Sequence, residues 1–220
     1  MSTTMTRAFA PLLLLACASA CAGSRTLADP TLVIESSAGR ELGVSTDYGV
    51  VFLGRTAQAG DVEITAWFGD GPNVEAATIE PIGGGLYTAE TEIRLPQVPM
   101  SFEDPRPGSS LLVIGRRDGA PWEQSVTVRQ DPRVLGLLLS PSGSLAGSAE
   151  LVGAGVYWLP EGEYEQRRLV GLVSGRIRIE GEGGSREFLT AFGPDQLWRL
   201  VTHRRDLLQR RRWIYREDVL

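Results

Sequence analysis

Short apolar runs separated by turn residues make up most of the chain beyond residue 30. Seven such runs lie in the first half, at residues 31–36, 48–54, 61–68, 75–82, 86–95, 110–116 and 122–129. Several alternate apolar and polar side chains, as in residues 62–68, where Val62, Ile64, Ala66 and Phe68 fall on one face. A period of two is typical of strands with one buried and one solvated face.

These runs predict a mainly β protein that begins with an Ig-like β-sandwich over residues 31–132. Seven short strands with a turn every eight to twelve residues match that architecture. The glycine turn at 83–85 and the following strand also resemble part of a bacterial Ig-like domain. The Cys…Trp…Cys pattern of antibody domains is missing from the sequence, so only the general sandwich is expected.

Residues 133–220 have a different texture and predict a smaller β-rich or α+β region. Apolar runs at 134–139 and 151–159 and a hairpin at 172–180 and 185–192 indicate more strands. A helix is expected to begin at Pro194, although Arg204 and Arg211 interrupt its apolar stripe, and residues 213–215 are expected to form a short strand. Whether this region is a separate domain or extends the first sheet is left open.

The N-terminus has the pattern of an export signal. Arg7 precedes a nine-residue apolar stretch from Ala8 to Ala16, which is too short to span a bilayer, since a span needs about 20 residues. Leu14-Leu15-Ala16-Cys17 resembles the lipobox of bacterial lipoproteins, and Ala18-Ser19-Ala20-Cys21 is a second match.

This resemblance implies lipidation at Cys17 or Cys21, with residues 1–21 as the signal and 22–30 as a tether. It also implies a place in the cell envelope. Because alanine follows either cysteine, the implied address in a Gram-negative cell is the outer membrane. No thiol lies beyond Cys21, so the body can form no disulfide.

Charge is divided unevenly along the chain. Residues 24–160 hold nine arginines against 17 acidic residues, whereas residues 196–216 hold seven arginines against one acid, Asp206. Such a basic segment can bind an anionic partner, either anionic lipid or an acidic envelope protein. The candidate residues are Arg204, Arg205, Arg210, Arg211, Arg212 and Arg216. The alternative is a solvated helix face that pairs with the acidic body of the same chain.

The sequence offers little for catalysis, cofactors or metals. All 22 basic residues are arginine, which excludes mechanisms that need a lysine, and His203 is the only histidine. A zinc site would need several His or Cys ligands. No G-x-S-x-G motif occurs, and no glycine-rich loop predicts a bound nucleotide. A nucleic acid partner is not expected either, because an exported, membrane-tethered protein rarely meets nucleic acid. Trp67 is the best candidate for an exposed aromatic that could stack on a sugar.

These observations lead to the hypothesis of a lipid-anchored envelope protein without catalysis, in an interaction or structural role. Two alternatives stay open. One is a hydrolase of envelope polysaccharide that uses paired carboxylates, although no pair stands out in the sequence. The other is binding of anionic lipid through the arginine-rich C-terminal segment.

Overall fold

The strands form two antiparallel sheets in the computed structural model, which describes residues 29–57, 62–143, 151–160, 163–181 and 184–217. The first sheet has the strand order β5-β4-β1-β2-β3-β7-β6. Its strands are β1 (Thr31–Ser36), β2 (Gly39–Thr46), β3 (Gly49–Phe52), β4 (Glu63–Phe68), β5 (Gly71–Ala76), β6 (Thr78–Gly83) and β7 (Leu86–Glu90).

The second sheet is a closed barrel with the order β10-β13-β12-β11-β8-β9. Its strands are β8 (Ser110–Arg117), β9 (Ala120–Arg129), β10 (Leu137–Pro141), β11 (Gly155–Trp158), β12 (Arg168–Gly181) and β13 (Gly184–Phe192). A short 3-10 turn, Tyr164–Gln166, precedes β12, and helix α1 (Pro194–Glu217) follows β13.

The mainly β class is confirmed, but the Ig-like sandwich is wrong. The strands at 110–129 close a barrel with those at 137–192, through pairs such as Ile114 with Gly155 and Val128 with Leu139. They therefore belong with the later strands, and the predicted boundary near residue 132 does not separate the two sheets. Alternation and turn spacing are the same in a sandwich and in a barrel, so the pattern could not distinguish the two.

Three clusters of apolar side chains hold this arrangement together. One fills the first sheet, with Leu32, Ile34, Phe52 and Ile64 among its members, and one fills the barrel. β1 is buried on both faces, because Val33 points toward the barrel cluster while its neighbours pack within the first sheet. The third cluster joins β2, β3, β11 and β12 to Leu197 and Leu200 of α1.

A buried ion pair fixes the start of the fold against the barrel. Arg116 of β8 is 6% exposed and lies 2.7 Å from Asp29, and its guanidinium stacks 3.9 Å from the ring centre of Trp67 in β4. The Pro30 carbonyl accepts a hydrogen bond from the Ser45 amide. Residues 29 and 30, placed in the predicted tether, are therefore part of the folded body.

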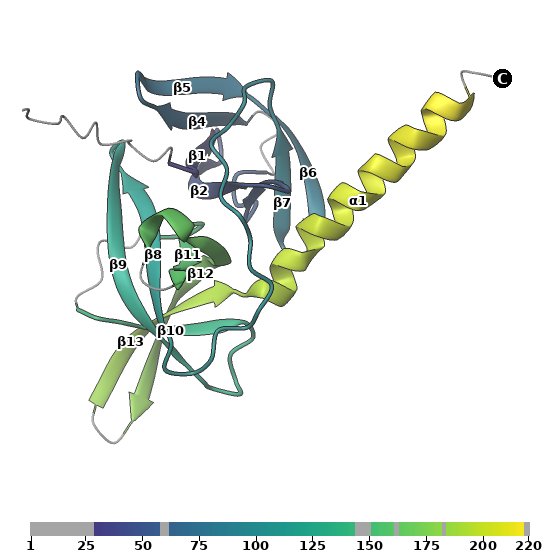
Figure 1. Cartoon of the computed structure of the whole chain (residues 1–220). Coiled ribbons are helices and arrows are strands. Elements are labelled where there is room, and N and C mark those ends of the chain that lie inside the picture. Colours follow the sequence, from purple (N-terminus) through teal and green to yellow (C-terminus); the bar gives the residue numbers. More distant parts are fainter. Residues whose placement is uncertain (1–28, 58–61, 144–150, 161–162, 182–183, 218–220) are drawn as a thin grey trace, which may run out of the picture.

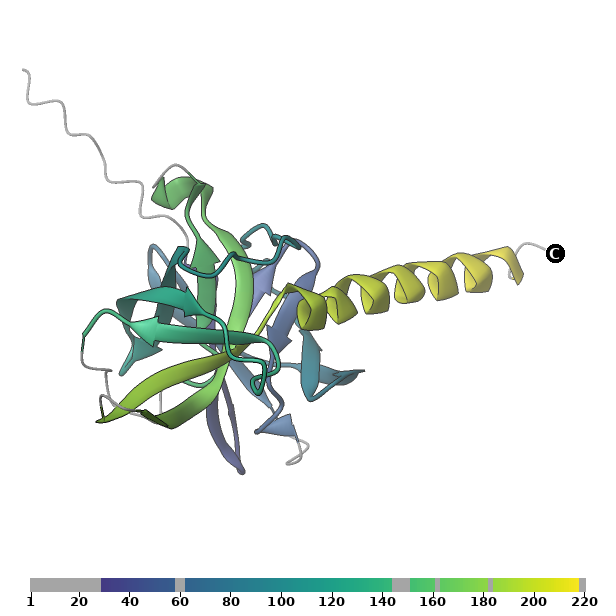
Figure 2. The same ribbon diagram turned by 90° about the horizontal axis from the view of Figure 1, so that it is seen from below.

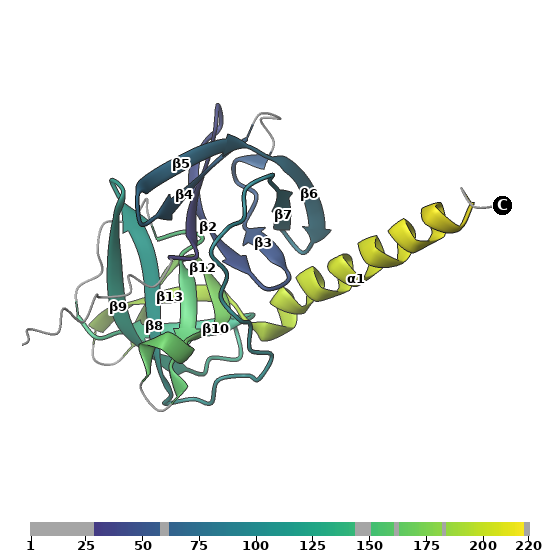
Figure 3. The same ribbon diagram turned by 45° about the horizontal axis from the view of Figure 1, so that its top comes forward.

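Helix α1 packs on the body with its first turns and then projects away from it (Figures 1, 2 and 3). Leu197 and Leu200 are buried, whereas Leu208 is about half exposed. The helix begins at Pro194 as predicted, but it continues to Glu217, so the predicted strand at 213–215 is wrong. No helix among the described residues is both long and apolar enough to cross a membrane.

Candidate functional site

In the described part of the chain, no strand pairs with one edge of the barrel strand β12 over the second half of its length. β11 pairs with β12 only from Arg168 to Leu172, while β13 pairs with it along the other edge as far as Gly181. Among the described residues, no strand covers β12 beyond Val173 on the β11 side. A strand edge of this kind presents unsatisfied N–H and C=O groups that can pair with another chain.

A β-bulge marks the inner end of this free edge. Val173 pairs with Ala191 and Gly175 with Thr190, so Ser174 is the extra residue. The Ser174 hydroxyl lies 3.0 Å from the Thr190 hydroxyl, which leaves the Ser174 carbonyl turned toward the first sheet, where it accepts a hydrogen bond from Arg55. Bulges of this kind often stand beside functional sites, because they redirect the chain.

A groove of about 590 Å³ runs beside this part of β12. Its apolar lining comes from Leu135, Ile177 and Ile179, and Ser174 and Thr190 also line it. Leu135 is 92% exposed, although it is a large apolar residue. A large apolar side chain that is exposed at a groove is a feature of protein recognition sites.

The loop that carries Leu135 is held in place by an arginine–aspartate pair. The Arg133 amide and side chain donate hydrogen bonds of 2.6 to 2.9 Å to the two carboxylate oxygens of Asp131. These bonds lower the pKa of Asp131 to about 2, so its carboxylate is ionised at neutral pH. The pair fixes the turn that presents Leu135, and Asp131 cannot serve as a general acid.

Contacts between the two sheets lie at Val173, next to Ser174 at the end of the edge that no described strand covers. The Leu42 amide donates to the Val152 carbonyl over 3.1 Å, and the Gly153 amide donates to the Val173 carbonyl over 2.8 Å. Above this contact, Arg55 reaches from the segment after β3 to the Ser174 carbonyl at 3.1 Å. The positively charged guanidinium of Arg55 therefore lies where the free edge of β12 meets the first sheet.

The neighbours of Arg55 along the chain hold its backbone in place. Thr56 is buried, and both its amide and its hydroxyl donate to one carboxylate oxygen of Glu41 over 2.8 Å. Gly54 has φ of +73° and lies against the ring of Tyr87, where any side chain would overlap the ring. Arg55 itself is exposed, so its guanidinium is presented by a fixed backbone.

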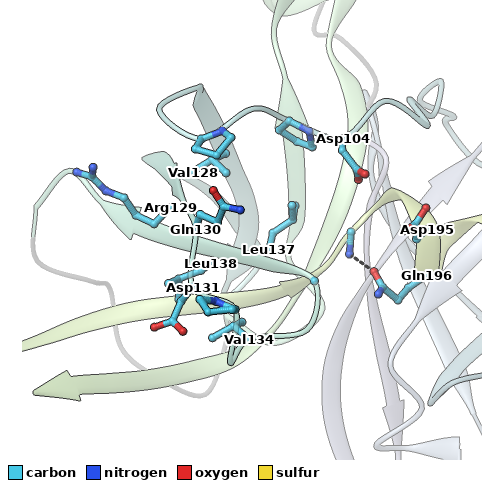
Figure 4. Close-up of a pocket in the computed structure, with 15 residues that line it drawn as sticks. Asp104, Val128, Arg129, Gln130, Asp131, Val134, Leu137, Leu138, Asp195 and Gln196 are labelled. Carbon is cyan, nitrogen blue, oxygen red and sulfur yellow. Dashed lines mark hydrogen bonds between the residues drawn. The ribbon is translucent and has the colours of Figure 1, made fainter.

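A second hollow, of about 380 Å³, lies across the 131–134 loop at the start of α1 (Figure 4). Asp104, Asp131 and Asp195 line it, but Asp131 is engaged by Arg133. Gln196 turns back to accept a hydrogen bond from the Gly193 amide at 2.7 Å, which caps the helix. In this hollow, Asp131 and Gln196 therefore stabilise the local fold. No group of three or more possible metal ligands exists among the described residues.

The residues predicted as sites from the sequence do not meet in the groove. Arg204 and Arg205 are exposed on α1, while the side chains of Arg210, Arg211, Arg212 and Arg216 lie outside the described residues. Binding of an anionic partner there stays a prediction. Cys17 and Cys21 also lie outside the described residues, and their lipidation stays a prediction as well.

The histidine and the tryptophan singled out in the sequence both have local partners. His203 Nε2 lies 3.0 Å from the Glu80 carboxylate, between α1 and β6, and His203 does not line the groove. Trp67 is covered by the Arg116 guanidinium and packs against the barrel core, so it is no exposed sugar platform.

Comparison with solved structures identifies the architecture. The chain superposes on the MamO protease domain from Magnetospirillum magneticum with a TM-score of 0.55 and 18% identity, over 81% of this chain and 97% of that one. A serine endoprotease from Yersinia pestis gives 0.55 and 14% identity, over 81% of this chain and 64% of that one. Deg5 gives 0.54 and 16% identity, over 78% and 87%.

The fold is that of serine proteases. At these identities the likeness concerns the fold alone. No family model and no curated protein matches the sequence.

This result overturns the function that was inferred from a sandwich. The hypothesis of a protein without catalysis in an interaction or structural role rested on an Ig-like domain, and the solved structures of the same fold are proteases. The expectation against an enzyme is corrected for the same reason. The comparisons also give no support to the alternative of a polysaccharide hydrolase, since none of these three structures is a glycosidase.

Sequence reasoning missed the residues that form the groove. Leu135, Ile177 and Ile179 were counted as ordinary strand positions, and Arg55 lay in a turn. The Arg-Ile-Arg-Ile alternation at 176–179 indicated a binding surface, because two isoleucines on one face of a charged strand need an apolar partner to pack against. The position of Arg55 beside Ser174, 119 residues later, had no sequence signal.

Proposed function

We propose that this protein recognises an extended segment of polypeptide, which adds as a strand to the free edge of β12. The observation that carries the proposal is the edge of β12 beyond Val173, with which no described strand pairs, on a strand that also lines a groove with the exposed Leu135. Main-chain hydrogen bonds to the edge provide affinity, and alternate side chains in the groove provide selectivity. The fold supports the same conclusion, since proteases act on polypeptides.

Recognition is the part of protease chemistry that these residues support. A Ser–His–Asp mechanism needs a histidine base beside a serine, and the one histidine in the sequence, His203, contacts Glu80 away from the groove. The residues around β12 therefore support a proposal of polypeptide recognition.

Substitution of Leu135 tests the site. Peptides are selected on the full chain from a random library about ten residues long, the upper length of a typical strand. Leu135→Asp should weaken the binding of the selected peptides by at least about tenfold, because their apolar side chains lose an apolar partner. Dissociation constants measured by calorimetry or fluorescence anisotropy give the comparison.

Val74→Asp is the matched control, since Val74 is also an exposed aliphatic residue but lies on β5. N-methylation along a selected peptide adds a test of strand pairing. Each blocked N–H that pairs with β12 should cost about two- to tenfold in affinity, at alternate residues only. Equal loss in both aspartate variants, or tolerance of N-methylation at every position, contradicts the proposal.

We also propose that the protein is a lipoprotein of the cell envelope, held by an acyl group on Cys17 or Cys21. The support is the lipobox pattern together with the short apolar stretch before it. Cells fed a clickable palmitate should label the wild-type chain, and either Cys17→Ser or Cys21→Ser should abolish the label. Unchanged labelling of the double variant, or a chain that keeps Met1, contradicts this anchor.

A further inference from the structure

The backbone around Val173 restricts how a polypeptide added to β12 can lie, and this inference rests on the proposed function. Every strand pair in the barrel is antiparallel. A chain that continues this pattern along the free edge runs antiparallel to β12, from Glu180 toward Ser174. Its C-terminal end therefore points toward the first sheet.

The described backbone leaves no path for such a chain beyond Ser174. Val173 already exchanges hydrogen bonds with the segment before β11, through the Gly153 amide at 2.8 Å and the Ala154 carbonyl at 2.9 Å. The backbone of Leu42 lies directly on that segment, bonded to Val152. A strand added to β12 must stop or turn away at this point.

Arg55 stands at the point where the added strand stops. One of its terminal N–H groups donates to the Ser174 carbonyl, which orients the guanidinium at the end of the free edge. A guanidinium has five N–H donors, so this single bond leaves a fork that can hold a carboxylate in two parallel hydrogen bonds. The nearby Glu41 is buried and turned inward to Thr56.

We infer that the bound polypeptide ends beside Ser174, with a carboxylate at its last residue on the guanidinium of Arg55. The ligand is thus a peptide C-terminus, taken up by strand addition along β12. The same chemistry can come from the α-carboxylate or from an Asp or Glu side chain at the last position, and the two sources are separated by the experiment below.

The test compares paired peptide libraries on the full chain. Each random peptide is made once with a free C-terminal acid and once with a C-terminal amide, and a third set carries aspartate at the amidated last position. The free acids should bind at least about tenfold more tightly than the amides, as expected for a charge-assisted hydrogen-bonded pair. The preference should shrink with added salt.

Arg55→Gln should remove the preference for acids, so that each acid binds no more tightly than its amide. Arg55→Lys should restore only part of this preference, because an ammonium cannot form the bidentate pair. Arg94→Gln, which removes another exposed arginine of the first half of the chain, is the matched control and should have no effect. Thermal unfolding of each variant verifies that it is folded.

The outcomes separate the inference from the function on which it rests. Equal affinity of acids and amides, or a preference for acids that survives in Arg55→Gln, overturns the inference. The proposed function still holds in that case if peptide binding depends on Leu135. Tight binding of the aspartate amides assigns the carboxylate to a side chain, and weak binding assigns it to the chain terminus. A library from which no peptide binds overturns both.

Discussion

Two arginine–aspartate pairs have nearly the same N–O distance but differ in the burial of the arginine. Arg116 and Asp29 are 2.7 Å apart, with side chains 6% and 18% exposed, whereas Arg133 and Asp131 are 2.6 Å apart, with side chains 75% and 13% exposed. Solvent weakens an exposed pair, while a buried charge that loses its partner keeps its full desolvation cost. The buried pair therefore matters for stability, and the exposed pair shapes a local turn.

Removal of Arg116 should destabilise the fold strongly. Arg116→Ala leaves the Asp29 carboxylate without its partner and removes the guanidinium that covers Trp67. The expected loss is about 3 kcal/mol of unfolding free energy, measured by urea denaturation. Arg133→Ala, at the exposed pair, should change that free energy far less. Similar effects of the two substitutions would mean that burial does not decide the strength of these pairs.

At the scale of elements, the periodic strands could be predicted from the sequence and their partners could not. Residues 31–36 form β1 as expected, because apolar side chains occupy both of its faces. β2 was missed: Leu42 and Val44 are its only branched aliphatic residues, although its residues 41–46 are buried. The buried polar residues Glu41, Ser45 and Thr46 conceal the strand in the sequence.

The length of β12 and its free edge could not be predicted from the sequence either. The strand was expected at 172–180 and covers Arg168–Gly181, so its first four residues were missed although Leu169 and Val170 are apolar. Pairing with β11 stops at Leu172, which depends on the path of the segment before β11. The groove arises from these long-range pairings, and a pattern of local alternation contains no information about them.

The two sheets of the whole molecule meet backbone to backbone at one point. Gly153 has φ of +82°, and its Cα lies directly against the Leu42 carbonyl. The adjacent Leu42–Val152 hydrogen bond joins β2 to the segment before β11. Because the same segment is hydrogen-bonded to Val173, where the proposed binding edge of β12 begins, the junction of the sheets and the proposed binding site share their support.

Gly153→Ala should therefore damage stability and peptide binding together. An added methyl group would overlap the Leu42 carbonyl oxygen and would also strain a backbone at positive φ, for a combined loss of at least about 2 kcal/mol. Gly39→Ala is the control, since Gly39 has φ of +138° with open space around it and pays for backbone strain alone. Urea denaturation and the affinity of a selected peptide provide the two measurements. If both variants lose equal stability and bind the peptide as wild type does, the backbone contact between the sheets neither holds them together nor shapes the end of the proposed binding edge.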